Sequence, residues 1–372
     1  MTLRRTLAVV SVAAATLAVS GSLSAYGYYY RLQSSIHHED PDAMLGKDRP
    51  KKLNASVNLL LLGSDSRAGG NAKYGRGHQS EAPKADSVIL VHIAAGGGRA
   101  YGVSIPRDLV VPIPSCPKKK GPPTPALSLA MFNSAFARGG PTCTIRTVEK
   151  FSGIHIDHFV QVDFTGFKGL TEAVGGVSIC LPKAVHDPKS GLNLPKGTSV
   201  VKGETALEFV RARYTLGDGT DTQRMRRQQQ FMASFARQAM TSGVLSSPSR
   251  LNKLLGTGAR SMTTDRALSL SEMLRLAQGV RGLSADSLKF VTLPSSPWVR
   301  NRNRVAMTPA AAPFLAAIRE DRDPLATLKP KDGASPGRTA GARPTRPAQS
   351  KSPAPTGDEI RPSDDICRKT WG

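Results

Sequence analysis

Short apolar runs that alternate with helical periodicity constrain the fold of this chain more than any other feature. Residues 57–62 form an apolar run interrupted only by Asn58, and runs rich in strand-forming residues follow at 87–93 and 100–105. Runs of this length are typical of buried strands. Further strands are expected at residues 158–164, 177–181 and 287–293, and helices at 144–151, 167–174, 204–213, 222–240, 265–280 and 309–320. This alternation predicts an α/β fold with a central mixed sheet flanked by helices.

The N-terminal segment carries no charge over residues 7–30, and Arg4 and Arg5 precede it. About 20 apolar residues suffice to span a bilayer. We therefore predict one transmembrane helix within residues 1–30, with a cytoplasmic N-terminus and an extracellular body. A cleaved signal peptide is the alternative. Either interpretation places the body outside the plasma membrane.

Composition divides the rest of the chain into five segments. A polar stalk is expected at residues 31–55, a catalytic domain at 56–245 and a structured extension at 246–328. Residues 329–361 are rich in Pro, Ala and Arg, which predicts a disordered linker. Residues 362–372 form a tail that contains Cys367.

The formal charge of the 372-residue chain is +23, which favours anionic partners such as anionic lipid, phosphate-bearing substrates or acidic wall polymers. An exported body argues against nucleic acid as the partner. Because no helix-turn-helix or zinc-finger pattern is present, we expect no nucleic acid to bind.

Four cysteines agree with an oxidising compartment and allow three pairings. Cys116 and Cys143 flank a stretch rich in Lys, Pro and Gly, which a disulfide would close. We expect this pair and a second one between Cys180 and Cys367. Two free, buried thiols are the alternative.

Arginines occupy positions where apolar residues are expected. In the segment 204–213, Arg213 continues the apolar stripe, and in the next helix Arg224, Arg227 and Gln228 share a face with two phenylalanines. Asp221 is placed to cap that helix. Guanidinium groups beside a helix N-terminus favour phosphate or pyrophosphate. Alternatively, the arginines pair with Glu204, Glu208 or Asp221.

Acidic residues stand at the strand ends. Asp65 follows the first strand and Asp86 begins the second, so adjacent strands would bring both carboxylates to one end of the sheet. Two carboxylates beside a phosphate site predict Mg²⁺, whereas loop capping is the alternative. Arg107 follows the third strand, where Asp108 could orient it by a salt bridge.

Taken together, these residues resemble the LytR-CpsA-Psr family of cell-wall glycopolymer ligases. The resemblance covers roughly residues 57–240 and rests on the joint order of several short motifs. They are Gly63-Ser64-Asp65-Ser66-Arg67, Ala85-Asp86-Ser87, Ser104-Ile105-Pro106-Arg107-Asp108, Val174-Gly175-Gly176-Val177, Arg211-Ala212-Arg213 and Asp221-Thr222-Gln223-Arg224 with Arg227-Gln228-Gln229. The cysteine spacing and the basic tail resemble actinobacterial members.

The resemblance implies transfer of a phosphate-linked glycan from a polyprenyl-pyrophosphate carrier to a peptidoglycan hydroxyl. Asp65 and Asp86 would hold Mg²⁺, and Arg107, Arg213 and Asp221 would be catalytic. The diphosphate would contact Arg67, Arg107, Arg211, Arg213, Arg224 and Gln228. Family members also enclose the lipid tail between the sheet and helices, for which phenylalanines 159, 164, 167, 209, 231 and 235 are candidates.

One position departs from the family pattern, and three other functions remain open. Many members carry a lysine where this chain has Met131, two residues before Asn133. The alternative functions are a lipid-pyrophosphate pyrophosphatase, a non-catalytic glycopolymer-binding protein and a transcriptional attenuator.

Overall fold

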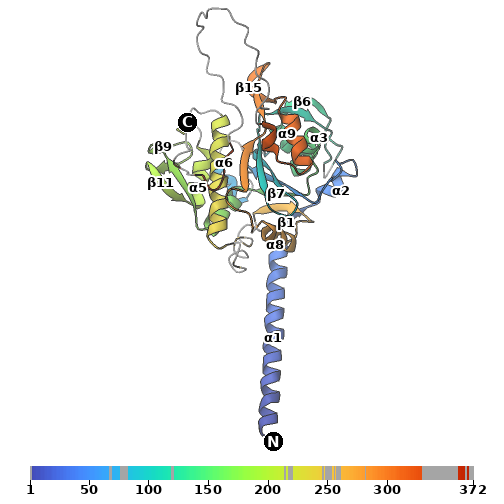
Figure 1. Ribbon diagram of the computed structural model, residues 1–372, viewed down its shortest axis with the longest axis vertical. Helices are drawn as coiled ribbons and strands as arrows, with labels where there is room; N and C mark the ends of the chain where they lie inside the picture. Colours follow the sequence, from blue (N-terminus) through green and yellow to red (C-terminus); the bar gives the residue numbers. More distant parts are fainter. Residues whose placement is uncertain are drawn as a thin grey trace, which may run out of the picture.

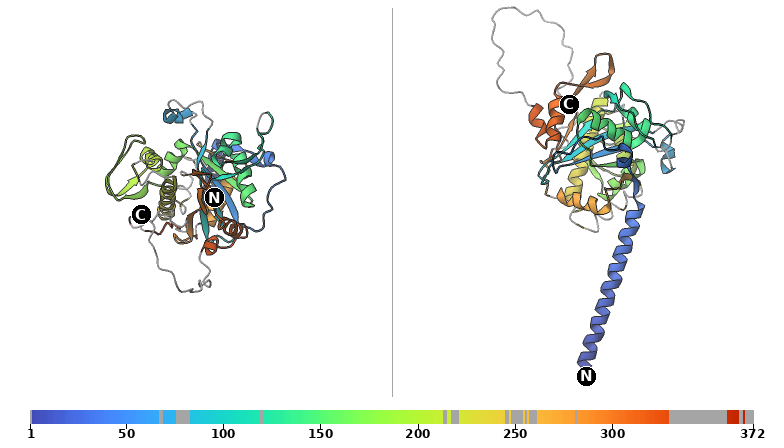
Figure 2. Two further views of the ribbon diagram at one scale, coloured as in Figure 1. Left: turned by 90° about the horizontal axis from the view of Figure 1, so that it is seen from above. Right: turned by 90° about the vertical axis from the view of Figure 1, so that its right-hand side faces the viewer.

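A computed structural model of the protein (Figure 1) describes residues 2–66, 69–75, 83–118, 121–212, 215–216, 221–244, 247, 254, 256, 261–280, 282–328, 359–364 and 367. One long helix, α1 (Thr2–Ser35), projects from a mixed α/β body. Figure 2 shows the same projection from a second side.

A seven-stranded mixed sheet organises the body, in the order β1-β12-β7-β2-β3-β4-β13. Its strands are β1 (His37–Glu39), β2 (Val57–Ser64), β3 (Ala85–Ile93), β4 (Ala100–Ile105), β7 (His158–Val162), β12 (Met262–Asp265) and β13 (Leu288–Thr292). Strands β2, β3 and β4 pair antiparallel, whereas β7 lies parallel to β2 and β13 parallel to β4. The predicted central mixed sheet is therefore confirmed.

The turn between β3 and β4 explains why these strands form a hairpin. Gly96 and Gly97 have φ values of 79° and 74°, in the left-handed region that glycine adopts without steric cost. The turn brings the end of β4 back beside the start of β3, where Ile105 pairs with Val88. Asp86 and Arg107 thereby lie at the same end of the sheet.

Helices cover one face of the sheet and form the larger core. Phe136 and Val148 of α3 (Asn133–Ser152) and Phe314 of α9 (Ala311–Arg319) belong to one buried cluster with Leu60 and Leu90 of the sheet. The expected helix at 144–151 is only the second half of α3, which bends at Gly139 and Gly140. The remaining short helices on this side and near the sheet ends are α2 (Pro41–Leu45), η1 (Gly69–Gly75), α8 (Leu270–Gly279) and η2 (Pro324–Leu328).

A second lobe packs beside the opposite face. It contains the helices α4 (Phe164–Ala173), α5 (Gly203–Arg211) and α6 (Asp221–Thr241). Its two small antiparallel sheets pair β8 (Val177–Leu181) with β11 (Gly197–Val201), and β9 (Val185–Asp187) with β10 (Leu192–Leu194). Phe209 and Phe231 are buried in its core, with ring centroids 6.1 Å apart.

The segment 204–213 forms a shorter helix than predicted. Helix α5 ends at Arg211, and Ala212 has ψ of 130°, outside the helical region. The helix predicted to reach residue 213 therefore ends at Arg211. Arg213 itself lies outside the described residues.

Two further hairpins lie beside the sheet. One pairs β5 (Val110–Ile113) with β6 (Leu127–Met131), and the other pairs β14 (Ser295–Trp298) with β15 (Asn301–Met307). Residues 261–328 also supply β12 and β13, which stand on opposite sides of β2, β3 and β4. Residues on the two sides of the predicted boundary at 245/246 therefore contribute strands to the same central sheet.

Helix α1 is continuous over the segment predicted to cross a membrane. However, among the described residues no helix combines the length and the apolar character that a membrane span requires. The segment 7–30 lacks charge, but serine, threonine and glycine are interspersed among its apolar residues.

Both expected disulfides are present, Cys116–Cys143 and Cys180–Cys367. The second one joins the C-terminal segment to β8. In that segment Ile360 exchanges two backbone hydrogen bonds with Phe290 of β13, at 2.7 and 2.8 Å. Residues 359–364 thus lie along the edge of the central sheet.

Candidate active site

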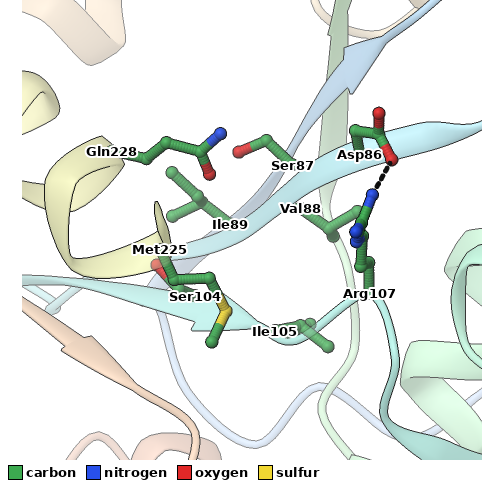
Figure 3. A pocket seen from close by; sticks show the side chains of 9 residues that line it. All are labelled: Asp86, Ser87, Val88, Ile89, Ser104, Ile105, Arg107, Met225 and Gln228. Atoms are coloured by element: carbon green, nitrogen blue, oxygen red, sulfur yellow. Dashed lines mark hydrogen bonds and ion pairs between the residues drawn. The ribbon is translucent and has the colours of Figure 1, made fainter. Parts of the chain in front are cut away.

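A small pocket opens at the sheet end where β3 begins and β4 finishes. Figure 3 shows side chains from both strands facing helix α6 across it. Its lining residues are Asp86, Ser87, Val88, Ile89, Ser104, Ile105, Arg107, Met225 and Gln228. Three residues predicted for the site, Asp86, Arg107 and Gln228, are therefore brought together.

The pocket holds a guanidinium between two carboxylates. Arg107 Nη1 lies 3.1 Å from Asp86 Oδ1, and Arg107 Nε lies 3.6 Å from Asp108 Oδ2. The side chain of Arg107 is 16% exposed and that of Asp86 is 41% exposed. The salt bridge between Arg107 and Asp108 was expected. Because Asp86 is the more accessible partner, an anion entering from solvent could compete with it for Arg107.

The loop after β4 fixes the backbone of Arg107. Leu109 N–H donates to the Pro106 carbonyl at 3.1 Å, which closes a tight turn around Arg107 and Asp108. Asn133 N–H donates to the Arg107 carbonyl at 3.0 Å. Only the side chain of Arg107 is therefore left to respond to a ligand.

Helix α6 supplies the opposite wall. Arg224 and Gln228 are four residues apart and so lie on one face, one turn from each other. Arg224 is buried, with 8% exposure. Gln228 lines the pocket directly, and its amide offers both a donor and an acceptor.

Arg227 is a buried cation with a structural contact. It is 2% exposed, and its Nη1 donates to the Leu216 carbonyl at 2.9 Å, while Nη2 donates to the Ala212 carbonyl. Burial, together with the charge of Arg224, lowers the pKa of Arg227 to about 10. Arg227 thus holds the backbone on either side of residue 213 against α6.

Buried Asp187 supports the same segment from the second lobe. Its Oδ2 accepts a hydrogen bond from Thr215 Oγ1 at 3.0 Å, and its charge acts to raise the pKa of Arg227. Sequence patterning did not single out Asp187, because it lies in a short strand without a recognisable motif. The role of such a buried acid can be recognised only when the residues that it contacts, which are distant in sequence, are known.

Gln229 was also missed as a site residue. Its Nε2 donates to the hydroxyls of Ser104 and Thr292, each at 2.9 Å. These contacts join α6 to β4 and β13 directly behind the pocket. The motif around Arg227 contained Gln229, but nothing in the sequence indicated that it points into the sheet.

Arg211 lies at a different place. It is exposed, and its guanidinium carbon is 5.2 Å from the ring centroid of Tyr74 and 5.1 Å from that of Phe164. Glu204, which was an alternative partner for the arginines, instead accepts hydrogen bonds from Tyr74 and from Lys168. Arg211 therefore rests on an aromatic platform and is not among the pocket-lining residues.

Asp65 stands at the expected end of the sheet. Its Oδ1 accepts the Lys84 N–H at 2.6 Å, and its own N–H donates to the Lys84 carbonyl. This contact is the capping role that was the alternative to metal binding. Arg67 and Arg213 lie outside the described residues, as does the side chain of Asp221, although α6 begins at that residue.

The donor chemistry at Asp86 fits a magnesium ion held jointly with a substrate. Among the described residues no group of three or more His, Cys, Asp or Glu side chains could hold a metal. Mg²⁺, however, commonly takes one or two protein carboxylates and completes its shell with phosphates and water. Asp86 Oδ1 accepts a hydrogen bond from Arg107, and within the part of the chain that the structure describes no hydrogen bond reaches its other oxygen.

The phenylalanines suggested as lipid-pocket walls are mainly core residues. Phe159 belongs to the core on the α3 side, whereas Phe209 and Phe231 are buried in the second lobe with Phe167 and Phe235 packed against them. Their packing role is therefore established.

Comparisons with known proteins agree with this architecture. A sequence profile of the LytR_cpsA_psr family matches residues 24–315. The chain belongs to the LytR-CpsA-Psr family. Its matched region includes every strand of the central sheet and helix α6.

Members of the LytR-CpsA-Psr family in other bacteria carry names from cell-wall synthesis. The chain is 32% identical over 264 residues to the cell wall biosynthesis protein LcpA of Corynebacterium glutamicum, covering 65% of this chain and 50% of LcpA. It is 30% identical over 237 residues to the polyisoprenyl-teichoic acid–peptidoglycan teichoic acid transferase TagU of Bacillus cereus, covering 62% of this chain and 70% of TagU. The chain spans about half the length of LcpA.

Solved structures of LytR-CpsA-Psr proteins share the fold. The LytR-Csp2A-Psr enzyme from Actinomyces oris superposes with a TM-score of 0.57 at 23% identity, covering 78% of this chain and 97% of that one. The structure of TagT bound to LI-WTA gives a TM-score of 0.54 at 21% identity, covering 74% and 96%. The Corynebacterium and Actinomyces relatives agree with the predicted actinobacterial type.

Proposed function

We propose that this protein is a transferase that moves a glycopolymer from a polyprenyl-pyrophosphate carrier onto a peptidoglycan hydroxyl. The observation that carries the proposal is the accessible carboxylate of Asp86 beside the half-buried guanidinium of Arg107, in one pocket with Gln228. Membership of the LytR-CpsA-Psr family and the naming of TagU as a teichoic acid transferase support it.

The pocket residues suit a diphosphate. Arg107 can grip two phosphate oxygens with its planar fork, and it remains charged at any physiological pH. Gln228 can donate to a third oxygen from the opposite wall. Arg224, one turn away on α6, adds a second positive charge, which is buried, on the same helical face. Fixed donors of this kind stabilise the charge that develops in phosphoryl transfer.

The proposed reaction is a substitution at phosphorus. The acceptor hydroxyl oxygen forms a bond to the phosphorus nearer the glycan, and the bond from that phosphorus to the bridging oxygen breaks. Polyprenyl phosphate leaves, and the hydroxyl proton passes to a base, for which Asp221 is proposed. Mg²⁺, when held by Asp86 with or without Asp65, would neutralise charge on the leaving phosphate.

The sheet face opposite α3 is suited to the carrier lipid. Leu60 and Leu62 point into the α3 core, so Leu59 and Leu61 point to the other face, and these two are only half-buried. Val162 of the neighbouring strand β7 is also half-buried. We propose that the polyprenyl chain covers these side chains. The two disulfides support an oxidising, exported location for the reaction.

The decisive experiment supplies the purified protein with a polyprenyl-pyrophosphate glycan, peptidoglycan and Mg²⁺. Release of polyprenyl phosphate and attachment of glycan are both measured. Asp86→Ala and Arg107→Ala should abolish transfer, whereas Arg275→Gln, which removes one charge from the exposed face of α8, should not. Wild-type rates in both pocket variants would refute the site. Donor consumption by hydrolysis alone would replace transfer with pyrophosphatase activity.

A further inference from the structure

The hairpin of β14 and β15 grows from the same sheet end as the pocket. Strand β13 runs parallel to β4, and Thr292 at its end lies opposite Ser104 of the pocket. The chain then enters β14 at Ser295 within three residues. Figures 1 and 2 show the hairpin projecting from the body at the end away from α1.

A backbone contact ties this hairpin to the arginine loop. Val305 N–H donates to the Asp108 carbonyl at 3.2 Å, and Val305 forms a parallel bridge with Leu109. Asp108 directly follows Arg107 and contacts its guanidinium. The hairpin and the loop that carries Arg107 are therefore adjacent. A polymer that lies along the hairpin would reach the pocket directly.

The hairpin is basic and carries no compensating acid. Arg300, Arg302 and Arg304 fall within five residues, and the sequence from 287 to 319 contains no Asp or Glu. The irregular pairing between Pro297 and Trp298 places residues 302–304 outside the regular ladder. No carboxylate among the described residues forms an ion pair with any of the three guanidiniums. Arg300 and Arg302 are exposed and Arg304 is half-buried.

The remaining side chains suit carbohydrate better than a lipid surface. Trp298 is half-buried, and the Arg300 guanidinium carbon lies 5.8 Å from its ring centroid, so an indole and a cation are presented together. Asn301 and Asn303 are exposed and can bond hydroxyl groups. Among the described residues of the hairpin, Val299 is the one large apolar side chain that is exposed, at 93%. A membrane-inserting tip would need more apolar area.

We propose that the β14–β15 hairpin binds an anionic glycan chain and leads it to the Arg107 pocket. The direction of the polymer toward the pocket rests on the proposed transferase function, whereas glycan binding by the hairpin does not. Guanidiniums recognise phosphodiester or carboxylate groups, and the tryptophan face packs on sugar rings. The occupant is the anionic donor glycopolymer, because three guanidiniums on a hairpin without a carboxylate suit a chain that itself carries anionic groups.

Glycan binding by the full-length protein and its variants tests the proposal. The test variant combines Arg300→Gln, Arg302→Gln and Arg304→Gln, all on the hairpin. The matched control combines Lys183→Gln, Lys196→Gln and Lys202→Gln, which removes the same charge from exposed positions of the second lobe. Co-sedimentation is measured with wall sacculi stripped of anionic polymer, and affinity is measured with the soluble polymer released from the wall.

The hairpin variant should bind the soluble polymer roughly tenfold more weakly, with a shallower salt dependence, because three charge contacts are lost. The control should stay near wild type, and thermal melting should be unchanged in both. Binding to stripped sacculi should change little in the hairpin variant. Trp298→Ala should weaken binding of the soluble polymer.

Three outcomes would overturn the proposal. The first is equal binding of the soluble polymer by the hairpin variant and wild type. The second is a loss confined to stripped sacculi, which would make the hairpin a contact for the peptidoglycan acceptor. The third is a loss confined to anionic phospholipid vesicles, tested in the same co-sedimentation assay, which would make the hairpin a membrane contact. If wild type shows no transfer but the hairpin variant loses glycan binding, the proposed function fails and the hairpin inference stands.

Discussion

Gln229, in the middle of α6, donates a hydrogen bond of 2.9 Å to the hydroxyl of Ser104 in the central sheet. The same amide nitrogen donates to Thr292 on the neighbouring strand at 2.9 Å. Gln229 is 3% exposed and Ser104 is buried, whereas Thr292 is half-buried. The two hydrogen bonds fix the height of α6 above the pocket and thereby the position of Gln228.

Replacing this buried amide should destabilise the protein. We expect Gln229→Met to lower the free energy of unfolding by about 1–2 kcal/mol, because two hydroxyls lose their donor. Urea unfolding measures the change. Gln278→Met, on the exposed end of α8, is the control and should have almost no effect. A neutral Gln229→Met would mean that the two hydroxyls are satisfied by each other.

Arg227 should act through the segment it holds. Arg227→Met leaves the carbonyls of Ala212 and Leu216 without their donor, so we expect a loss of about 2–4 kcal/mol in unfolding free energy. The affinity for the polyprenyl-pyrophosphate glycan should fall together with the free energy of unfolding. If this affinity falls while urea unfolding is unchanged, Arg227 contacts the substrate directly and the structural assignment is wrong.

Local patterns predicted the strands and helices that carry the site. The run at 100–105 coincides with β4, and the segment 222–240 differs from α6 by one residue at each end. Apolar periodicity depends on neighbours in the chain, so it is visible in the sequence. The same patterns put Asp86 at the start of one strand and Arg107 after the next, but their contact was seen only in the structure, where the hairpin makes these strand ends adjoin.

Contacts between distant segments could not be predicted in this way. Strand β13 pairs with β4, and β12 pairs with β1, although more than a hundred residues lie between the two strands of each pair. The second partner of β12 is β7, which is nearer in the sequence. The inward orientation of Gln229 depends on the height of α6, which tertiary packing decides. The tight ending of α5 at Arg211 likewise reflects the hydrogen bonds that Arg227 makes, and no local signal marks it.

Stability at acidic pH should depend on Asp265. Burial would raise the pKa of this carboxyl, but hydrogen bonds from His158 and from the N–H groups of Phe159 and Leu268 outweigh burial and lower it. Because the folded-state pKa lies below the unfolded one, Asp265 stabilises the fold above pH about 4, and this contribution is lost as pH falls through the folded pKa.

The measurement for Asp265 compares wild type with Asp265→Asn. At pH 7 the variant should lose about 1–3 kcal/mol of unfolding free energy, since the carboxylate accepts three hydrogen bonds. The difference should shrink as pH falls below about 4. A difference that stays constant down to pH 3 would show that packing, and not ionisation, explains the loss.

The two disulfides should contribute unequally. Cys180 and Cys367 are 187 residues apart in sequence, whereas Cys116 and Cys143 are 27 residues apart. In the chain-entropy description, the longer loop adds about 2 kcal/mol of extra stabilisation. Paired serine substitutions at each disulfide, compared by urea unfolding, test this. Equal losses would indicate that strain or residual structure in the unfolded chain cancels the difference.

The pair of Asp86 and Arg107 offers the sharpest test of metal binding. In Asp86→Asn the guanidinium loses a competing carboxylate, so donor binding without Mg²⁺ should become several-fold tighter, while Mg²⁺ should no longer accelerate transfer. In Arg107→Gln donor binding should weaken with and without the metal, and turnover should fall roughly 100- to 1,000-fold. Isothermal titration with a non-transferable pyrophosphate analogue separates binding from chemistry. Weaker metal-free binding by Asp86→Asn would show that this carboxylate positions Arg107 for the substrate and does not compete with it, and Mg²⁺ stimulation that persists in the same variant would remove Asp86 from the metal site.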